Sequence, residues 1–402
     1  AESFEWDSNP TVANNTRATI ISGAPTASAF SLVSTPDRHL IFFGTETTIG
    51  TKSTQDPMFV RFSSQEDINT YAPSATNTAG TQRLADGSKI VGAIRGRDAI
   101  YVWTDTALFT MRFVGPPFTF SFQQVGTNCG LIGQNAAVEV DGTAYWMSEN
   151  GFFRYTGRLE SLPCLVEDHV FDDINTIPKQ HINAGLNNLF GEVNWFYCTA
   201  ASDQIDRVVT YNYLDSSAKR PIWTTGTLPR AAWQDSAVFD RPHATCYKPD
   251  DDASSDVIGN TDGSTIYYQQ ETGTDQINAG GIVTAVIGNI VSGDFDITQR
   301  RSNTGQTVGM PDIRGDGEYI MRISRFIPDF ISQTGNTAVK FKTRLYPNSN
   351  ETTTSFTCDS TTTKKDVRVR ARQIALEVAN TGIAQDWKLG TFRLDVHPGG
   401  RR

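Results

Sequence analysis

A self-similar stretch in the first half of the chain constrains the fold most. Residues 89–158 contain two sets of short apolar runs, KIVGAIR, AIYVW and ALFTMRF, then NAAVEV, TAYWM and GFFRY. The sets superimpose at an offset of 43 residues, which places Asp98 on Asp141, Trp103 on Trp146 and Phe109 on Phe152. A period of about 40 to 50 residues is typical of the four-stranded blades of a β-propeller. The repeat therefore predicts an all-β fold with a propeller.

Weaker copies of the same pattern flank this stretch. They are RHLIFFG at 38–44, NWFYC at 194–198 and DGSTIYY at 262–268, the last of which matches DGTAYWM at 141–147. Inner strands of a blade are covered on both faces by neighbouring blades, so they should be continuously apolar, as these runs are. Five blade-like units are visible before residue 280. A β-sandwich or an irregular meander would give similar hairpins and remains an alternative.

The pattern changes after about residue 280. Longer strands with period-2 alternation follow, and in one of them Val367, Val369 and Ala371 alternate with arginines. The parity shifts at Gln373, as at a β-bulge, so that Ile374, Leu376 and Val378 continue the apolar face. One buried and one solvated face indicates an antiparallel β-sandwich. We expect a propeller domain over 1–280, which could lack upstream blades, and a sandwich domain over 281–402, beginning between about residues 275 and 295.

Charge is divided unevenly between these two parts. Residues 1–280 contain 18 Lys and Arg against 32 Asp and Glu, a balance of −14, and residues 281–402 contain 17 against 12, a balance of +5. An acidic lobe argues against tight nucleic-acid binding there, because phosphate binding depends on Lys and Arg. The acidic run KPDDDASSD, with Asp250, Asp251 and Asp252, could be a solvated loop, a partner-facing tip or a calcium site.

Motifs for catalysis and metal binding are absent from the sequence. No nucleophile elbow, Walker loop, H-E-x-x-H or EF-hand spacing occurs, and the histidines are scattered. The five cysteines lack metal-ligand spacing and are predicted to be free, buried thiols. GNTDGSTIY departs from a sialidase Asp-box. Paired carboxylates for glycoside cleavage need geometry that sequence does not supply. We expect no catalytic residue, no cofactor, no metal and no enzymatic activity.

Targeting signals are also missing. The start, AESFEWDSNP, lacks the basic and apolar segments of a signal peptide, and no uninterrupted apolar run reaches about 18 residues. We therefore expect no membrane anchor. The chain begins at Ala1 rather than Met, so residues could precede it in the natural protein.

Several segments resemble virion proteins of tailed phages. RHLIFFGTE, DPMFVRFSSQEDINTYAP, GRDAIYVWTDTALFTMRF and GLIGQNAAVEVDGTAYWMSENGFFRYTGR are similar to the propeller-bearing tail-nozzle, or packaged-DNA-stabilising, proteins of short-tailed phages. The ending VRVRARQIALEVANTGIAQDWKLGTFRLDVHPGGRR resembles their closing strands. The resemblance covers roughly residues 37–158 and 366–402. Family members are longer, with further blades upstream of a segment like FEWDSNP.

The resemblance implies a structural protein of the phage tail, made in the host cytoplasm and assembled into the virion. Its copies would form a ring, a hexamer by resemblance, around the channel through which viral DNA passes without specific binding. Other tail proteins, an adaptor and a tailspike or fibre, would be its partners. The alternative is a carbohydrate-binding or glycan-cleaving tail module for host attachment. Candidate subunit or channel contacts are the charged residues Asp250, Asp251, Asp252, Arg368, Arg370, Arg372, Arg401 and Arg402.

Overall fold

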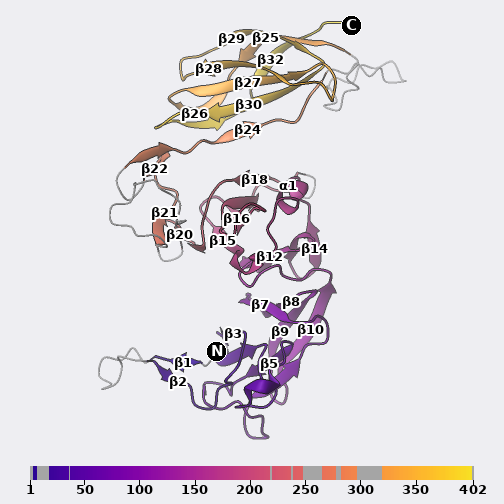
Figure 1. Cartoon of the computed structure of the whole chain (residues 1–402), viewed down its shortest axis with the longest axis vertical. Helices are drawn as coiled ribbons and strands as arrows, with labels where there is room; N and C mark the ends of the chain where they lie inside the picture. The colour runs from indigo at the N-terminus through magenta and orange to yellow at the C-terminus, as the bar shows by residue number, and fades with distance from the viewer. Residues whose placement is uncertain are drawn as a thin grey trace. The chain divides into compact units, whose positions relative to one another are not determined.

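A computed structural model describes residues 3–6, 18–35, 37–217, 220–236, 239–247, 265–277, 282–296 and 319–400 of this all-β protein (Figure 1). The contacts divide the chain into two compact units, one with strands β1 to β21 and one with β22 to β32. The division falls between Glu271 and Thr272, somewhat before the predicted boundary at 280 and 281, which stays a prediction. Among the described residues, no helix is long and apolar enough to cross a membrane.

The described part of the first unit contains four four-stranded antiparallel sheets, each formed by consecutive strands. The first sheet consists of β3 (Phe30–Ser34), β4 (His39–Phe43), β5 (Phe59–Phe62) and β6 (Gly80–Arg83). The second consists of β7 (Ile90–Arg95), β8 (Ile100–Thr104), β9 (Ala107–Gly115) and β10 (Thr119–Thr127). The third consists of β11 (Ala137–Val140), β12 (Thr143–Ser148), β13 (Gly151–Tyr155) and β14 (Leu159–Leu162). The fourth consists of β15 (Asn183–Asn187), β16 (Glu192–Tyr197), β17 (Arg207–Asn212) and β18 (Trp223–Gly226).

Smaller elements complete this unit. A fifth sheet has three described strands, β19 (Ala232–Gln234), β20 (His243–Tyr247) and β21 (Thr265–Gln269). Strands β1 (Phe4–Glu5) and β2 (Thr19–Ile20) form a two-stranded ribbon. The described helical segments are short: α1 (Glu167–Phe171), η1 (Lys52–Thr54) and η2 (Lys179–His181). Successive four-stranded antiparallel sheets of this kind are consistent with a propeller.

The strands of the predicted repeat are confirmed, but the two tryptophans are not equivalent positions. The hairpins of the second and third sheets superimpose at an offset of 44 residues rather than 43, so Trp103 corresponds to Met147 and Trp146 lies on the opposite face of its sheet. Trp103 lies on β8 and Trp146 on β12, each the second strand of its sheet, and both side chains are fully buried. Their ring centroids are 5.3 Å apart, so the second and third sheets pack against each other through them. On the opposite face of β8, Val102 belongs to the core shared with the first sheet. The second sheet is thus covered on both faces, which is why β8 has no polar face.

Two further details of the repeat are wrong. Phe109 pairs with Val102, whereas Phe152 pairs with Met147 rather than with Tyr145, because the second hairpin lies 44 residues after the first and not 43; each turn has two residues between its strands. Phe109 and Phe152 are both buried but are not equivalent in register. The run DGSTIYY was expected to match β12. Its described part is β21, the third strand of the fifth sheet, where residues of intermediate exposure alternate with exposed ones.

The second unit contains two sheets that share one hydrophobic core. One has the order β24 (Asn289–Val291), β30 (Gln373–Asn380), β27 (Thr337–Arg344), β28 (Thr352–Cys358). The other has the order β29 (Lys365–Ala371), β25 (Met321–Ile327), β32 (Arg393–Pro398). Two two-stranded sheets accompany them: β22 (Asp275–Ile277) with β23 (Val283–Ala285), and β26 (Phe330–Thr334) with β31 (Asp386–Leu389). The core includes Phe326 and Phe341 from facing sheets.

The predicted apolar positions of this unit are buried, but the parity shift has a different cause. Val367 and Val369 on β29 share one core with Ile374, Leu376 and Val378 on β30. The sequence suggested one strand with a β-bulge. Instead, β29 and β30 belong to different sheets, and the chain passes from one to the other at the bend that separates them. The side chains must reverse parity there so that both segments face the same core.

Candidate functional site

Cations are aligned across the outer face of the β29–β25–β32 sheet. Arg322 on the central strand lies opposite Arg370 on one side and opposite His397 on the other. Arg368 precedes Arg370 by two residues on β29, so the two share a face. All four residues are exposed, while the alternate positions of β29 and β25 near them are buried. We call these four residues the basic row.

The basic row has no acidic partner in the described part of the chain. Farther along β25, Arg325 pairs with Asp366 at 3.1 Å and with Asp395 at 3.4 Å. No such pair forms for Arg322, Arg368 or Arg370 among the residues that the structure describes. Like charges directly opposite on neighbouring strands destabilise a sheet, so this arrangement suits contact with an anionic surface.

The candidate contact residues from the sequence are only partly brought together. Arg368 and Arg370 lie in the basic row, as the alternation predicted. Arg372 does not: it is half-buried, and its guanidinium lies 5.7 Å from the ring centroid of Tyr346. Five further candidates lie outside the described residues, namely Asp250, Asp251, Asp252, Arg401 and Arg402.

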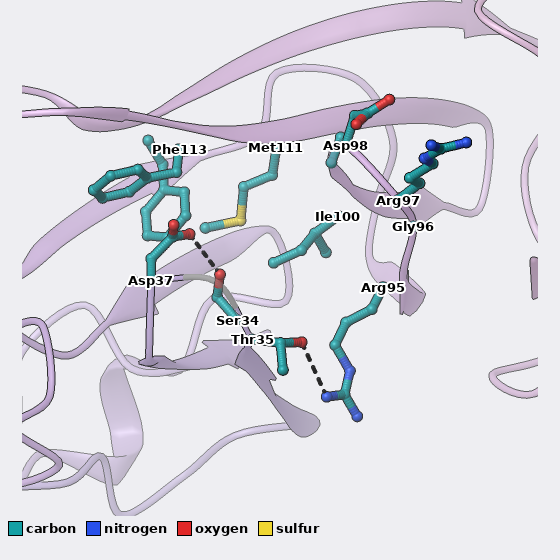
Figure 2. Close-up of a pocket in the computed structure, with 12 residues that line it drawn as sticks. Ser34, Thr35, Asp37, Arg95, Gly96, Arg97, Asp98, Ile100, Met111 and Phe113 are labelled. Atoms are coloured by element: carbon teal, nitrogen blue, oxygen red, sulfur yellow. Dashed lines mark hydrogen bonds between the residues drawn. The ribbon is translucent and has the colours of Figure 1, made fainter. Parts of the chain in front are cut away.

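A pocket of about 270 Å³ lies between the first and second sheets (Figure 2). The β3–β4 connection supplies Asp37, which is buried and accepts a hydrogen bond of 2.7 Å from the Ser34 hydroxyl. The β7–β8 connection supplies Asp98 on the opposite side of the pocket, separated from Asp37 by the side chains of Met111 and Ile100. The two carboxyls do not converge, so the pocket does not offer an acid–base pair.

Two glutamates do converge at one end of the fourth and fifth sheets. Asn187, the last residue of β15, donates from its Nδ2 to Glu271 Oε1 at 3.0 Å and to Glu192 Oε2 at 3.5 Å. Glu192 begins β16 and pairs with Asn187 across the hairpin, while Glu271 follows β21. Because both bonds share one nitrogen, the two carboxyl oxygens are no farther apart than the two distances added together. We call these three residues the glutamate pair site.

The carboxyls of this site favour the protonated form. Burial, and then the charge of Glu271, raises the pKa of Glu192 to about 6, while Asn187 opposes the shift. Burial also raises the pKa of Glu271, opposed by the Asn187 hydrogen bond and by the charge of Arg241. The Arg241 guanidinium donates to the backbone carbonyl of Glu271 rather than to its carboxyl. The two glutamates therefore lack a direct cationic partner in the described chain, and at mildly acidic pH they can share one proton.

The hairpin between β15 and β16 shapes the glutamate pair site. Gly191 has φ of +67°, and a Cβ there would lie 2.3 Å from Leu214, so only glycine fits this turn. The turn leaves Phe190 exposed, at 53%. Tyr213 donates from its hydroxyl to Asn188 Oδ1 at 3.0 Å and so ties the hairpin tip to the segment after β17. The turn that precedes Glu192 thus carries polar groups and one exposed aromatic residue.

Thiols and metal ligands form no comparable site. The five cysteines are free; Cys129, Cys198, Cys246 and Cys358 are buried, and Cys164 is half-buried, which confirms the expected free thiols. Burial raises the pKa of Cys129 to about 11 and of Cys164 to about 12, so neither is a reactive thiolate. Within the described ranges, no three His, Cys, Asp or Glu side chains are grouped so that they could hold a metal ion.

Comparisons with known proteins give only distant similarities. No family model matches the chain. No curated protein matches it either. Among solved structures, a "Glycoside hydrolase" is 12% identical with a TM-score of 0.25, covering 89% of this chain and 94% of that chain. An exo-beta-1,3-galactanase from Phanerochaete chrysosporium is 10% identical with a TM-score of 0.23, covering 91% and 79%. At such TM-scores neither similarity supports an argument about function.

Sequence reasoning missed most members of both candidate sites. Arg322 and His397 join the basic row only through strand register, which one sequence does not reveal. Glu192 and Glu271 are far apart in the chain and meet through the packing of two sheets. One local signal existed: Asn-Asn-Leu-Phe-Gly-Glu at 187–192 is a glycine-containing turn with an aromatic residue and an acid, typical of an exposed hairpin tip.

Proposed function

We propose that this protein is a structural subunit of a tailed-phage virion, one of several copies that form the nozzle ring of a short tail. The observation that carries this proposal is the basic row, an exposed set of basic side chains without an acidic partner in the described residues, on a protein whose residues 1–280 have a balance of −14. Complementary charge guides the register of an interface more than it adds affinity. The basic row of one copy would contact an acidic surface of the next copy, or of an adaptor or tailspike protein.

The first unit supplies the rigid part of this assembly. Its stacked sheets bury Trp103, Trp146 and Trp195 completely, a packing that supports the blades of a propeller. We propose that the four-stranded sheets are such blades. Acidic walls repel DNA phosphates, so duplex DNA would pass through the ring without being held. Head-to-tail contacts between identical copies close into rings, and the resemblance to nozzle proteins favours a hexamer.

The test is assembly of purified protein and of a charge-reversed variant. Arg322→Glu with Arg370→Glu should abolish ring formation in mass photometry and negative-stain images, because two cations of the interface become anions. Two reversals at exposed arginines outside the basic row, Arg97→Glu and Arg38→Glu, change the net charge equally and should leave rings intact. Wild-type protein that stays monomeric in the assembled tail, or rings that survive reversal of the basic row, would refute the proposal.

A second candidate function is carbohydrate binding or glycan cleavage by a tail module during host attachment. The observation that favours it is the glutamate pair site, where two carboxyls share the amide of Asn187. This chemistry is independent of ring assembly and is developed next.

A further inference from the structure

We propose that Glu192 and Glu271 are the catalytic residues of a glycoside-cleaving site whose substrate is a polysaccharide chain. Glu192 is the general acid and Glu271 the nucleophile. The inference goes beyond the structural role proposed above and does not depend on it. It also departs from the sequence-based expectation that the chain has no enzymatic activity.

The separation of the carboxyls fits this chemistry. With the two N–H bonds of an amide at their usual angle, acceptors at 3.0 and 3.5 Å from one nitrogen lie about 5 to 6 Å apart. Carboxyls of retaining glycosidases are roughly 5 to 5.5 Å apart, and those of inverting enzymes are roughly 6.5 to 9.5 Å apart. The geometry therefore points to retention of configuration through a covalent intermediate.

A buried amide without a full set of partners points to a ligand at the same place. Asn187 is 1% exposed, its Nδ2 faces both carboxyls, and its Oδ1 has no hydrogen-bond partner within the described residues. A buried acceptor left without a donor costs about 1 to 3 kcal/mol. A hydroxyl group of a bound sugar would supply that donor, and the exposed ring of Phe190 at the hairpin tip offers an apolar surface for a sugar face.

The proton is distributed as the reaction requires. Glu192 is the more buried side chain and its pKa is raised to about 6, so it keeps its proton at mildly acidic pH. The pKa of Glu271 is also raised, but Glu271 is the more exposed residue, and the Asn187 hydrogen bond and the charge of Arg241 oppose the shift. A proton on one carboxyl and a charge on the other define an acid and a nucleophile. The groups that determine the pKa values of the two carboxyls, besides burial, are the two glutamates themselves, Asn187 and Arg241.

The steps balance without a further reactant except water. Glu192 gives its proton to the glycosidic oxygen as the bond from that oxygen to the anomeric carbon breaks, and a Glu271 carboxylate oxygen forms an ester bond to that carbon. The leaving sugar departs as an alcohol. Water then attacks the same carbon, loses its proton to the Glu192 carboxylate and releases Glu271. The net reaction is hydrolysis of one glycosidic bond by one water molecule, which gives a new reducing end and a free hydroxyl group on the leaving sugar.

The experiment uses the full chain and two kinds of probe. With 4-methylumbelliferyl glycosides of common sugars, the readout is release of the fluorophore. With purified bacterial capsular and O-antigen polysaccharides, the readout is release of reducing ends. Glu192→Gln and Glu271→Gln should each lower the rate at least 100-fold, and wild-type activity should decline above about pH 6, as Glu192 loses its proton. The control, Glu66→Gln in the connection between β5 and β6, should keep full activity. Azide should restore cleavage of aryl glycosides to Glu271→Ala, giving a glycosyl azide, which a merely structural role would not produce.

Two results would overturn the inference: no release from any probe by the wild-type protein, or release that survives Glu192→Gln or Glu271→Gln. Circular dichroism of the variants excludes misfolding as the cause of a loss. Ring assembly of the same variants, measured in parallel, is expected to match the wild type. Failure of the glycan site and failure of the nozzle proposal are therefore separate outcomes.

Discussion

Two buried tryptophans at equivalent strands differ in one hydrogen bond, and this difference can be measured. Trp146 donates from Nε1 to the carbonyl of Cys129 at 2.8 Å, whereas the Nε1 of Trp103 is buried without a partner in the described residues. Both side chains are fully buried. Replacing each by Phe leaves a similar cavity, so the cavity terms largely cancel in a comparison. Trp146→Phe in addition leaves the buried Cys129 carbonyl without a donor, at a cost of about 1 to 3 kcal/mol.

Trp103→Phe instead removes a buried N–H group that has no hydrogen-bond partner in the described residues. Removing this group stabilises the fold, because its desolvation is no longer a cost. We therefore expect Trp146→Phe to lower the free energy of unfolding by about 1 to 3 kcal/mol more than Trp103→Phe. For a unit of this size, that corresponds to several degrees in Tm. Urea titration followed by far-UV circular dichroism gives the comparison, provided that the m-values agree. Equal losses, or a larger loss for Trp103→Phe, would refute the assignment of the hydrogen bond.

Three further predictions concern titratable groups. The raised pKa of Glu192 means that its contribution to stability is full below its ordinary pKa of 4.5 and is lost as the pH rises to about 6. Glu192→Gln should remove this dependence of Tm across that range, and it also removes the charge repulsion with Glu271. At pH 8 a thiol reagent should leave Cys129 and Cys198 unmodified in the folded protein and label both in urea. Rapid labelling without urea would contradict their burial. Lys340 and Lys342 both pair with Glu377 and lower the pKa of its carboxyl, so its contribution to stability is present above the ordinary pKa of a glutamate and is lost as the pH falls. Glu377→Gln should lower the free energy of unfolding by only about 1 kcal/mol in urea titration, because both lysines reach solvent. An unchanged free energy of unfolding at pH 7 would contradict this prediction.

Many of the strands could be predicted, because a strand that is buried on both faces is a run of consecutive apolar residues in the sequence. A strand such as β8 has no solvated side, so its residues are apolar apart from the terminal Thr104, and β12 has a similar apolar centre in Ala144, Tyr145, Trp146 and Met147. The run at 262–268 failed as a guide because tyrosines and isoleucine also suit an edge strand. Composition alone does not distinguish the two environments.

The candidate sites were less predictable because they depend on which strands become neighbours. Alternation along β29 identified Arg368 and Arg370, but not Arg322, whose position opposite Arg370 follows from register between distant segments. Glu192 and Glu271 are two acids among 44 Asp and Glu, and their approach depends on the packing of the fourth and fifth sheets. Long-range pairing of this kind is not encoded in any local pattern.

The passage of the chain between sheets at Arg372 has a consequence for how this protein can vary. Residues on both sides of the bend face one core, so their spacing fixes which side chains point inward. Substituting Arg372 changes side-chain contacts such as the one with Tyr346, whereas deleting or adding a single residue there would turn every later side chain of β30 to the wrong side. In related sequences, the length of this segment should therefore vary far less than the identity of the residue at the bend.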